Sequence, residues 1–358
     1  MSLLKETLRN IGELDRQAMR RARERVDGLI KPPGSLGQLE EIAVKMAGIT
    51  GRDRPRVGKR CVVVMAGDHG VVDEGVSAAP RDVTWQMLPA FIRGVAGIGV
   101  LARHAGASVT VVDVGVAADV DIPGVLKRRV RPGTGNIASG PAMSREEAMA
   151  AMEVGIEVAL EEIKRGATLL ALGDMGIGNT TPSSAILAAL GGYSPAEVTG
   201  RGTMINDRLL ERKRQVVARA LEVNKPDPAD GLDVLAKVGG LEIAGLAGVA
   251  LACASRRVPV LVDGFITGAA ALAAAAIEPR ARHFMLASHL SAEPGHRLML
   301  EMLGLEPMLD MGMRLGEGTG AALAMHIVEG ACRVLDEMVT FAEAGVLDLE
   351  EDKLCRDK

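Results

Sequence analysis

The chain has 358 residues with a formal net charge of -4, and hydrophobic residues make up 48% of it. This length and hydrophobic content favour a large core in one domain or two, built mainly from aliphatic side chains because only 2% of residues are aromatic. The acidic balance and the lack of a basic cluster with interleaved aromatic residues argue against nucleic-acid binding.

The two ends of the chain are charged and helical in pattern. The first 25 residues are amphipathic and lack the apolar core of a signal peptide. The four cysteines are scattered without a CxxC pair, which argues against a zinc site or a disulfide framework. We therefore expect a cytoplasmic protein. Residues 1–30 and 326–358 are expected to form a small helical domain together, beside a large α/β catalytic domain at 31–325.

The middle of the chain alternates short apolar runs with longer helical segments. Each run is continuous rather than alternating, and each ends in Gly, Asp, Ser or His. Continuous apolar strands between helices indicate a parallel sheet covered on both faces, and therefore a Rossmann-like α/β fold. Polar residues directly after the strands favour a site at the carboxyl edge of that sheet. The expected strands are Arg60–Met65, Val109–Val114, Ala167–Leu172, Val258–Val262 and His283–Ala287.

Several helices carry recognisable start and stop signals. Ser144 and Glu147 form an S-x-x-E capping box, and Gly166 is the expected stop of the same helix. Thr181 followed by Pro182 is typical of an N-cap with proline in the first turn. The two most apolar later runs, near residues 241–255 and 264–277, are each about 14 residues long, short of the ~20 needed to span a bilayer. We expect buried helices and no membrane partner.

One glycine-rich segment, Gly173 to Thr180, follows a strand and opens a helix. Glycines there let the backbone approach an anion closely, and the free N–H groups of the helix start favour negative charge. The order of glycines is not the dinucleotide fingerprint, and the chain has no P-loop motif. Phosphate binding and a tight turn that needs glycine for steric reasons remain equal alternatives for this loop.

Other turns suit the same task. Gly200-Arg201-Gly202-Thr203 precedes a helix that carries Lys213, Asp263-Gly264 follows another strand, and Ser291 follows the last one. Taken singly, Lys213 reads better as a solvated helix charge and Ser291 as an N-cap near Pro294. Several such turns on one edge favour a phosphorylated sugar.

Two other kinds of site are weakly supported. Ser291 lies near His289 and His296, but no G-x-S-x-G elbow accompanies them, so a serine hydrolase is disfavoured. Asp68-His69-Gly70 pairs one acid with one histidine and lacks a second ligand at helical spacing, so it is a poor metal signal.

Nine motifs then occur in the order of one family. The sequence strongly resembles the nicotinate-nucleotide:dimethylbenzimidazole phosphoribosyltransferase family over essentially its whole length. The motifs are KPPGSLGQLE, AGDHGV, GVSAAP, VTWQM, RPGTGNIASGPAM, GDMGIGNTT, LVDGFITGAAAL, SHLSAEPGH and LGEGTGAALA.

The resemblance implies an activity and an architecture. Members transfer phosphoribose from nicotinate mononucleotide to 5,6-dimethylbenzimidazole, giving α-ribazole 5′-phosphate and nicotinate for the lower ligand of cobalamin. The family fold is a Rossmann-like domain with a small helical domain built from both termini, assembled as a homodimer. The leaving pyridine nitrogen departs neutral, so we expect neither a metal nor a cofactor.

The resemblance also assigns site residues. Glu317, in the GEG turn before a helix, matches the catalytic base, and the helix after Gly318 is expected to keep it ionised. Without the resemblance, Glu317 would read as an acid that only complements the helix dipole. Phosphate and ribose contacts are matched by Gly176, Gly202, Lys213, Gly264 and Ser291, with Asp174 at the acid position of the glycine loop. The benzimidazole pocket is matched by Gln86, Met87, Met175 and Leu315.

Two departures from the family pattern concern the base. Asp174 stands where the family usually has Glu, and Ala78 and Ala79 stand where relatives carry larger or polar side chains. Both changes remove material from the expected pocket. The alternatives are the same reaction with another base, such as another benzimidazole, adenine or a phenol, and a non-catalytic nucleotide-binding protein on the same fold.

Overall fold

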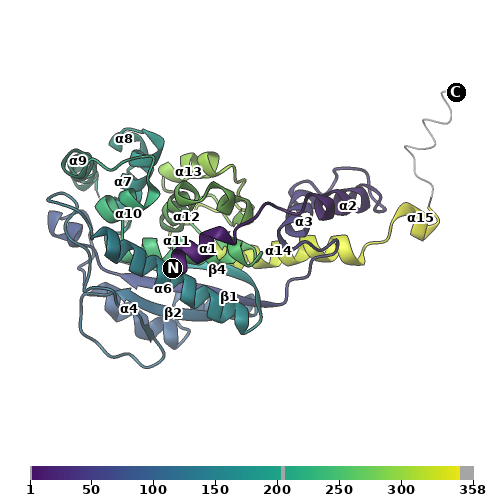
Figure 1. Cartoon of the computed structure of the whole chain (residues 1–358), viewed down its shortest axis with the longest axis horizontal. Helices are drawn as coiled ribbons and strands as arrows, with labels where there is room; N and C mark the ends of the chain where they lie inside the picture. Colours follow the sequence, from purple (N-terminus) through teal and green to yellow (C-terminus); the bar gives the residue numbers. More distant parts are fainter. Residues whose placement is uncertain (1, 203–205, 347–358) are drawn as a thin grey trace. The chain divides into compact units, whose positions relative to one another are not determined.

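The computed structural model describes residues 2–202 and 206–346 and contains a six-stranded sheet (Figure 1). The strand order is β3-β2-β1-β4-β5-β6, and every neighbouring pair is parallel. This is the doubly wound order, in which the chain turns back between β1 and β4. The expected Rossmann-like α/β class is confirmed. The strands are β1 (Lys59–Gly67), β2 (Ala107–Gly115), β3 (Leu126–Lys127), β4 (Ala167–Met175), β5 (Val260–Val262) and β6 (Met285–Ala287).

The five expected apolar runs all contribute strands of the sheet, but their bounds differ. Strand β5 begins at Val260, two residues after the expected start. His283 and Phe284 belong to a 3-10 helix, Pro279–Phe284, so β6 is shorter than expected. The edge strand β3 was missed because it has only two residues, one of them the exposed Lys127. An element that short leaves no periodicity to read.

Fifteen α-helices and two 3-10 helices are assigned within the described residues. The α-helices are α1 (Leu3–Arg9), α2 (Arg16–Asp27), α3 (Gln38–Thr50), α4 (Val83–Ile92), α5 (Gly97–His104), α6 (Arg145–Lys164), α7 (Thr180–Gly191), α8 (Pro195–Val198), α9 (Asp207–Asn224), α10 (Gly231–Val238), α11 (Leu241–Ser255), α12 (Phe265–Ile277), α13 (Gly295–Leu303), α14 (Thr319–Glu337) and α15 (Phe341–Ala344); the 3-10 helices are η1 (Gly70–Glu74) and η2 (Pro279–Phe284).

The helix start signals have mixed outcomes. The capping box of α6 is confirmed: the Glu147 N–H donates to Ser144 Oγ at 3.1 Å, and the Ser144 N–H donates to Glu147 Oε2 at 2.8 Å. The expected N-cap at Thr181 is wrong. Helix α7 already begins at Thr180, with Asn179 as its N-cap, so Thr181 lies buried inside the first turn.

The long apolar helices are buried inside the protein. Helices α11 and α12 coincide with the two expected runs, and almost every residue in them is buried. One other stretch, Val83–His104, is apolar and long enough to span a membrane by composition. It consists of two separate helices, α4 and α5, and each is far shorter than the ~20 residues that a span requires.

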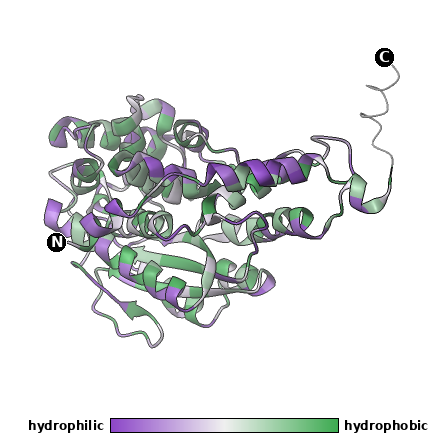
Figure 2. Ribbon diagram, turned by 45° about the vertical axis from the view of Figure 1, so that its right-hand side comes forward, coloured by the Kyte–Doolittle hydropathy of each residue, from purple (hydrophilic) through white to green (hydrophobic). Residues whose placement is uncertain are grey.

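The central strands β1 and β4 are almost fully buried, as their continuous apolar runs predict, and Figure 2 shows the middle of the sheet mainly in the colour of hydrophobic residues. Successive side chains of β1 point to opposite faces. Met65 packs against the Gly245 backbone of α11, whereas Val62 packs against Gly318 at the start of α14. Helix α11 and the start of α14 therefore lie on opposite sides of the same strand.

Helices α6 and α11 approach each other at backbone distance. A Cβ atom on Gly155 of α6 would collide with the Gly245 carbonyl of α11, and one on Gly248 would collide with the Met152 carbonyl. Small residues at both sides of the crossing let the two helices pack this closely over the sheet.

The chain divides into two compact units. The first consists of the residues up to Glu13 together with Gly58–Met325, and it contains the sheet. It includes α1 because that helix packs on α6 and α11. The second consists of Leu14–Val57 with the residues from His326 onward. Of the boundaries between the expected domains, only the one after Met325 coincides with a boundary between these units. The expected division into domains stays a prediction. Its residues 347–358 lie outside the described part of the chain.

The second unit has its own small core. Helices α2 and α3 pack together, and the loop between them is anchored by a buried ion pair, Lys31 Nζ to Glu40 Oε1 at 2.9 Å. Arg25 donates to the Leu335 carbonyl near the end of α14 at 2.9 Å.

Of the cysteines, Cys61, Cys253 and Cys332 are buried free thiols, and Cys355 lies outside the described residues.

Gly155→Ala should destabilise the protein, because the added methyl group meets the backbone of α11. Overpacking of this kind costs about 1–3 kcal/mol, so we expect a Tm lower by at least about 2 °C in differential scanning calorimetry. The control is Gly330→Ala in α14, where a Cβ meets nothing within 4 Å and the Tm should hold or rise. Equal Tm values for Gly155→Ala and the parent would contradict the tight crossing.

Candidate active site

A cavity of about 220 Å³ opens at the carboxyl edge of β4, β5 and β6. Its walls come from α4, the loops after these three strands and the turn before α14. All of the expected site residues line it except Gln86 and Lys213. The lining residues are Val83, Met87, Asp174, Met175, Gly176, Ile177, Asn179, Thr180, Gly202, Gly264, Phe265, Ile266, His289, Ser291, Glu293, Arg314, Leu315, Gly316 and Glu317.

The two exceptions differ in kind. Gln86 is exposed on α4, whose cavity side carries Val83 and Met87 one turn apart. Lys213 lies directly behind the wall: its Nζ donates to Thr180 Oγ1 at 2.7 Å and to the Gly200 carbonyl at 3.2 Å. With 1% of its surface exposed, Lys213 is not the solvated charge that its sequence context alone favours. Burial lowers its pKa to about 8.

The glycine loop after β4 is shaped by close backbone contacts. A Cβ on Gly176 would lie 2.5 Å from the Gly67 carbonyl and 3.1 Å from His69 Nε2, so only glycine fits there. The Ile177 N–H donates to Thr84 Oγ1 at 3.1 Å, and α7 begins at Thr180. The interpretation of this loop as a tight turn that needs glycine for steric reasons is therefore correct. Because α7 also has an open N-terminus at the cavity wall, anion binding remains an interpretation of the same loop.

A buried ionic pair lies beneath this loop. His69 Nε2 and Glu242 Oε1 are 2.7 Å apart, and both side chains are almost fully enclosed. Burial opposes a charged imidazole, but Glu242 outweighs it and raises the pKa of His69. Within residues 2–202 and 206–346, no group of three or more His, Cys, Asp or Glu side chains is arranged around a possible metal ion.

Asp174 ends β4 with its carboxylate at the cavity. Its Oδ2 accepts from Asn179 Nδ2 at 2.9 Å. Burial, reinforced by the nearby negative charges of Glu242 and Glu317, raises its pKa to about 7, although the Asn179 hydrogen bond opposes the shift. Asp174 therefore exchanges its proton near neutral pH, which an exposed aspartate does not.

Glu317 occupies an unusual backbone conformation. Its φ is 63°, between Gly316 at 83° and Gly318 at 90°, so three consecutive residues are left-handed. Its Oε2 accepts from the Ile98 N–H in the first turn of α5 at 3.0 Å. The carboxylate therefore caps α5, a different helix from the one that follows it in sequence.

The expected ionisation of Glu317 needs correction. We expected the helix after Gly318 to favour the charged form. Burial instead raises the pKa of Glu317, and the Ile98 hydrogen bond offsets this only in part. A carboxylate with a raised pKa is a stronger proton acceptor, so the correction supports the assignment as a base.

Asp263 anchors the turn that carries Glu317. After β5, its Oδ1 accepts from the Ala321 N–H at 2.8 Å and its Oδ2 from the Gly318 N–H at 3.2 Å. The Gly318 amide ends the turn before α14, and the Ala321 amide lies in the first turn of α14. Although these bonds favour the ionised form, burial raises the pKa of Asp263 to about 8. The sequence placed Asp263 after a strand but gave no reason to connect it with residue 317.

The serine–histidine arrangement of a hydrolase is not formed. His296 Nδ1 accepts the backbone N–H of Ser291 at 2.9 Å, and Ser291 Oγ accepts from the Glu293 N–H at 3.4 Å. His289 Nδ1 lies 3.1 Å from Ser288 Oγ instead. No imidazole therefore activates Ser291. Its hydroxyl serves the turn before α13, close to the N-cap role that its sequence context favours.

The sequence missed several residues of the cavity and misplaced others. Ala78 and Ala79 do not line it, so their departure from the family pattern does not enlarge its walls. Thr203 lies outside the described residues. Lining residues outside the expected set include His289, Glu293 and Arg314, together with the apolar pair Phe265 and Ile266. The signal available for them was the same as for Ser291 and Gly264, namely a position just after a strand or beside a matched residue.

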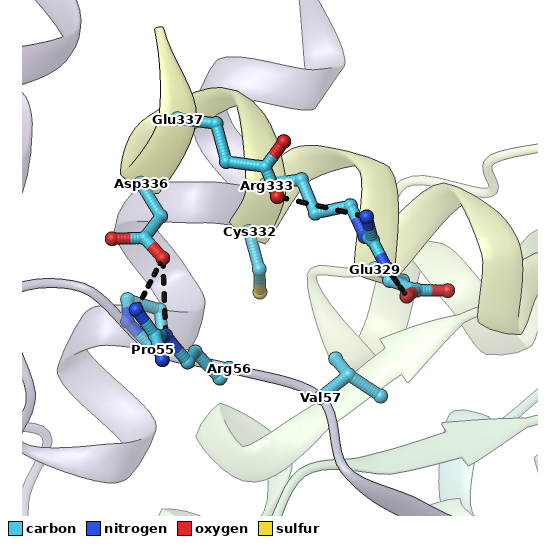
Figure 3. A pocket seen from close by; sticks show the side chains of 8 residues that line it. All are labelled: Pro55, Arg56, Val57, Glu329, Cys332, Arg333, Asp336 and Glu337. Atoms are coloured by element: carbon cyan, nitrogen blue, oxygen red, sulfur yellow. Dashed lines mark hydrogen bonds and ion pairs between the residues drawn. The ribbon is translucent and has the colours of Figure 1, made fainter.

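A second cavity, of about 370 Å³, lies within the second unit (Figure 3). Its charged side chains neutralise one another: Arg56 donates to Asp336 Oδ2 at 3.0 Å, and Arg333 donates to Glu329 Oε1 at 3.0 Å. The thiol of Cys332 lies between these pairs. This cavity contains none of the expected site residues.

Comparison with known proteins gives consistent matches. The phosphoribosyltransferase family model matches residues 11–346. A protein of Chloroflexus aggregans (strain MD-66 / DSM 9485), named nicotinate-nucleotide–dimethylbenzimidazole phosphoribosyltransferase, is 58% identical over 352 residues, covering 98% of this chain and 100% of the relative. One of the same name from Desulforamulus reducens (strain ATCC BAA-1160 / DSM 100696 / MI-1) is 57% identical, covering 97% and 99%.

Two crystal structures from Thermus thermophilus are also similar. One, of a nicotinate-nucleotide–dimethylbenzimidazole phosphoribosyltransferase, superposes with a TM-score of 0.89 at 50% identity, covering 94% of this chain and 100% of the other. The second, described as CobT, gives a TM-score of 0.90 at 51% identity, covering 92% and 99%.

Asp174→Asn should stabilise the protein at pH 8 more than at pH 5. The native state holds the Asp174 proton more tightly than the unfolded chain does, because the pKa is raised to about 7. Unfolding free energy is therefore lost as pH rises from about 4 to 7, and the amide variant escapes this loss. We expect the difference between the Tm of Asp174→Asn and the Tm of the parent to increase by about 2–4 °C as the pH rises over that range. The exposed Asp310→Asn serves as the control. A pH-independent difference would refute the raised pKa.

Proposed function

The chain belongs to the nicotinate-nucleotide–dimethylbenzimidazole phosphoribosyltransferase family, and from this membership we propose that Glu317 is the base of its reaction. The chain is a phosphoribosyltransferase that moves phosphoribose from nicotinate mononucleotide to 5,6-dimethylbenzimidazole. The products are α-ribazole 5′-phosphate, for the lower ligand of cobalamin, and nicotinate.

The reaction sets a small chemical demand. The unprotonated nitrogen of the benzimidazole forms a bond to C1 of the ribose as the bond from C1 to the pyridinium nitrogen breaks. The electron pair of the broken bond returns to the pyridine ring, which departs neutral and needs no acid. The second benzimidazole nitrogen becomes acidic as positive charge develops on that ring, so its proton goes to one general base.

The observation that carries the proposal is the position of Glu317. It is a buried carboxylate with a raised pKa, and it lines the cavity with the glycine loop. Its hydrogen bond to Ile98 uses Oε2, which leaves Oε1 for the proton of the ring. A fixed carboxylate of this kind supplies both proton transfer and stabilisation of the developing cation.

We assign the remaining residues to the two ends of the cavity. The phosphate binds at Gly176, Thr180 and Gly202, with Lys213 contributing its charge from behind Thr180. Ser291 and Gly264 contact the ribose beside them. Such positioning of the sugar contributes to the rate by bringing C1 to the incoming nitrogen.

The flat base lies against Met87, Met175 and Leu315, next to Glu317. Gln86 is exposed beside Met87 and contacts a base only through a change of rotamer. Asp174, one methylene shorter than the usual Glu, already bonds Asn179 and keeps its place at the cavity wall.

We also propose a homodimer in the cytoplasm.

Two alternatives to the proposed reaction are the same reaction with a different preferred base and nucleotide binding without turnover. Incubation with nicotinate mononucleotide separates them. Nicotinate release that requires a base supports the transferase, and a panel of benzimidazoles, adenine and phenols with product identification finds the preferred acceptor. No release with any base would leave only the binding protein.

Glu317→Gln should lower kcat by at least about a hundredfold, the usual effect of losing a general base. The amide oxygen of Gln can still accept the Ile98 N–H and the backbone is unchanged, so the fold should be intact. Binding of nicotinate mononucleotide, measured by isothermal titration calorimetry, should stay within about threefold of the parent. Near-normal turnover in this variant would remove Glu317 from the mechanism.

Activity should survive exhaustive treatment with a metal chelator. The reason is the leaving group, because a neutral pyridine needs no divalent cation to stabilise it, unlike a pyrophosphate. The measurement is the rate of α-ribazole 5′-phosphate formation before and after dialysis against EDTA. Activity that falls more than about tenfold and returns with Mg²⁺ or Zn²⁺ would overturn this expectation.

A further inference from the structure

Glu293 places a carboxylate at the phosphate end of the cavity. It lies between β6 and α13, lines the cavity, and is only 6% exposed. Its Oε1 accepts from the Gly202 N–H at 2.8 Å. Gly202 is a residue to which we assign phosphate binding, so the amide that should meet the phosphate is held by a carboxylate.

The second oxygen of Glu293 is buried without a hydrogen-bond partner in the described part of the chain. The carboxylate packs so closely on Gly200 that a Cβ there would collide with Oε2. Lys213 donates to the carbonyl of the same Gly200 at 3.2 Å. Glu293 and Lys213 therefore contact the same glycine turn, and the negative charge of Glu293 limits the fall in the pKa of Lys213 that burial causes.

A buried carboxylate oxygen without a donor is energetically unfavourable, so Oε2, which packs against Gly200 on a side chain that lines the cavity, needs a partner. It cannot be a phosphate dianion, because two anions in a site of low dielectric repel each other. The group that suits Oε2 is a hydrogen-bond donor without negative charge. In a sugar phosphate, such donors are the hydroxyls, which lie a few bonds from the phosphate.

We propose that Glu293 makes the site specific for a phosphate that carries a sugar. Glu293 occupies the Gly202 amide; when the nucleotide binds, the phosphate takes this amide and the carboxylate accepts a ribose hydroxyl. A bare phosphate ion meets the repulsion of Glu293 without supplying the hydroxyl. The inference rests on the proposed function for the identity of the sugar phosphate and adds the residue that excludes free phosphate.

The test is isothermal titration calorimetry with two ligands, inorganic phosphate and ribose 5-phosphate. The proteins are the parent, Glu293→Gln, and the control Glu301→Gln, which removes an exposed charge from α13. Gln keeps an oxygen for the Gly202 N–H but carries no charge. We expect Glu293→Gln to bind inorganic phosphate at least about fivefold more tightly and ribose 5-phosphate at least about fivefold more weakly, and the control to change neither.

Changes in affinity of opposite sign for the two ligands distinguish a role of Glu293 in specificity from a purely structural role. If Glu293 only supports the Gly200–Gly202 turn, both ligands weaken together in Glu293→Gln, and the proposal is overturned. Unchanged binding of both ligands, or a parent that binds no ribose 5-phosphate at millimolar concentration, overturns it equally.

A second variant covers the case in which Glu293→Gln does not fold. Glu293→Asp keeps the charge and shortens the reach, so it should exclude inorganic phosphate as the parent does and weaken only ribose 5-phosphate. Tighter phosphate binding by this variant would count against the proposal. These measurements need no turnover, so a parent that transfers phosphoribose to no base would sink the proposed function and still leave the role of Glu293 decided by calorimetry.

Discussion

The active-site geometry depends on the hydrogen bonds between Asp263 and the start of α14. Three successive left-handed residues, Gly316 to Gly318, form a turn that the backbone would not keep unaided, because the central residue is not glycine. Asp263 holds the far end of this turn through the amides of Gly318 and Ala321, and the Ile98 N–H of α5 holds the carboxylate of Glu317. Segments far apart in the sequence, the residue after β5 and the first turn of α5, therefore fix the same turn and its side chain.

The same region concentrates negative charge. Asp174, Asp263, Glu293 and Glu317 all lie at the carboxyl edge of the sheet, and burial raises the pKa of the first, second and fourth. A transition state that develops positive charge on the ribose and the incoming ring is stabilised by fixed anions of this kind in a low-dielectric site. Under the proposed assignment, the phosphate lies in the opposite environment, near Lys213 and the amides of the glycine turns. The cavity thus has two ends of different polarity.

Most of the sheet was accessible from sequence because buried parallel strands are continuous apolar runs. The two-residue β3 was not, since its pairing depends on its neighbour β2 rather than on its own pattern. The lining of the cavity was accessible where motifs matched, as for Gly176 and Glu317. It was inaccessible where a long-range contact decides the role: Lys213 reads as a surface charge until α9 packs it behind Thr180, and Ala79 reads as a pocket residue until the cavity forms elsewhere. The direction of the pKa shift at Glu317 depended likewise on burial that only the fold creates.

The left-handed backbone of Glu317 has a consequence for the evolution of this position. A non-glycine residue at this φ costs roughly 1 kcal/mol relative to glycine, and the buried carboxylate adds an ionisable group to the interior. The hydrogen bond that Glu317 accepts from the Ile98 N–H acts in the opposite direction. If Glu317 has the proposed role of the base, a lineage supplied with finished cofactor from outside loses the selection that keeps a strained and buried acid here, and this position would be expected to change early.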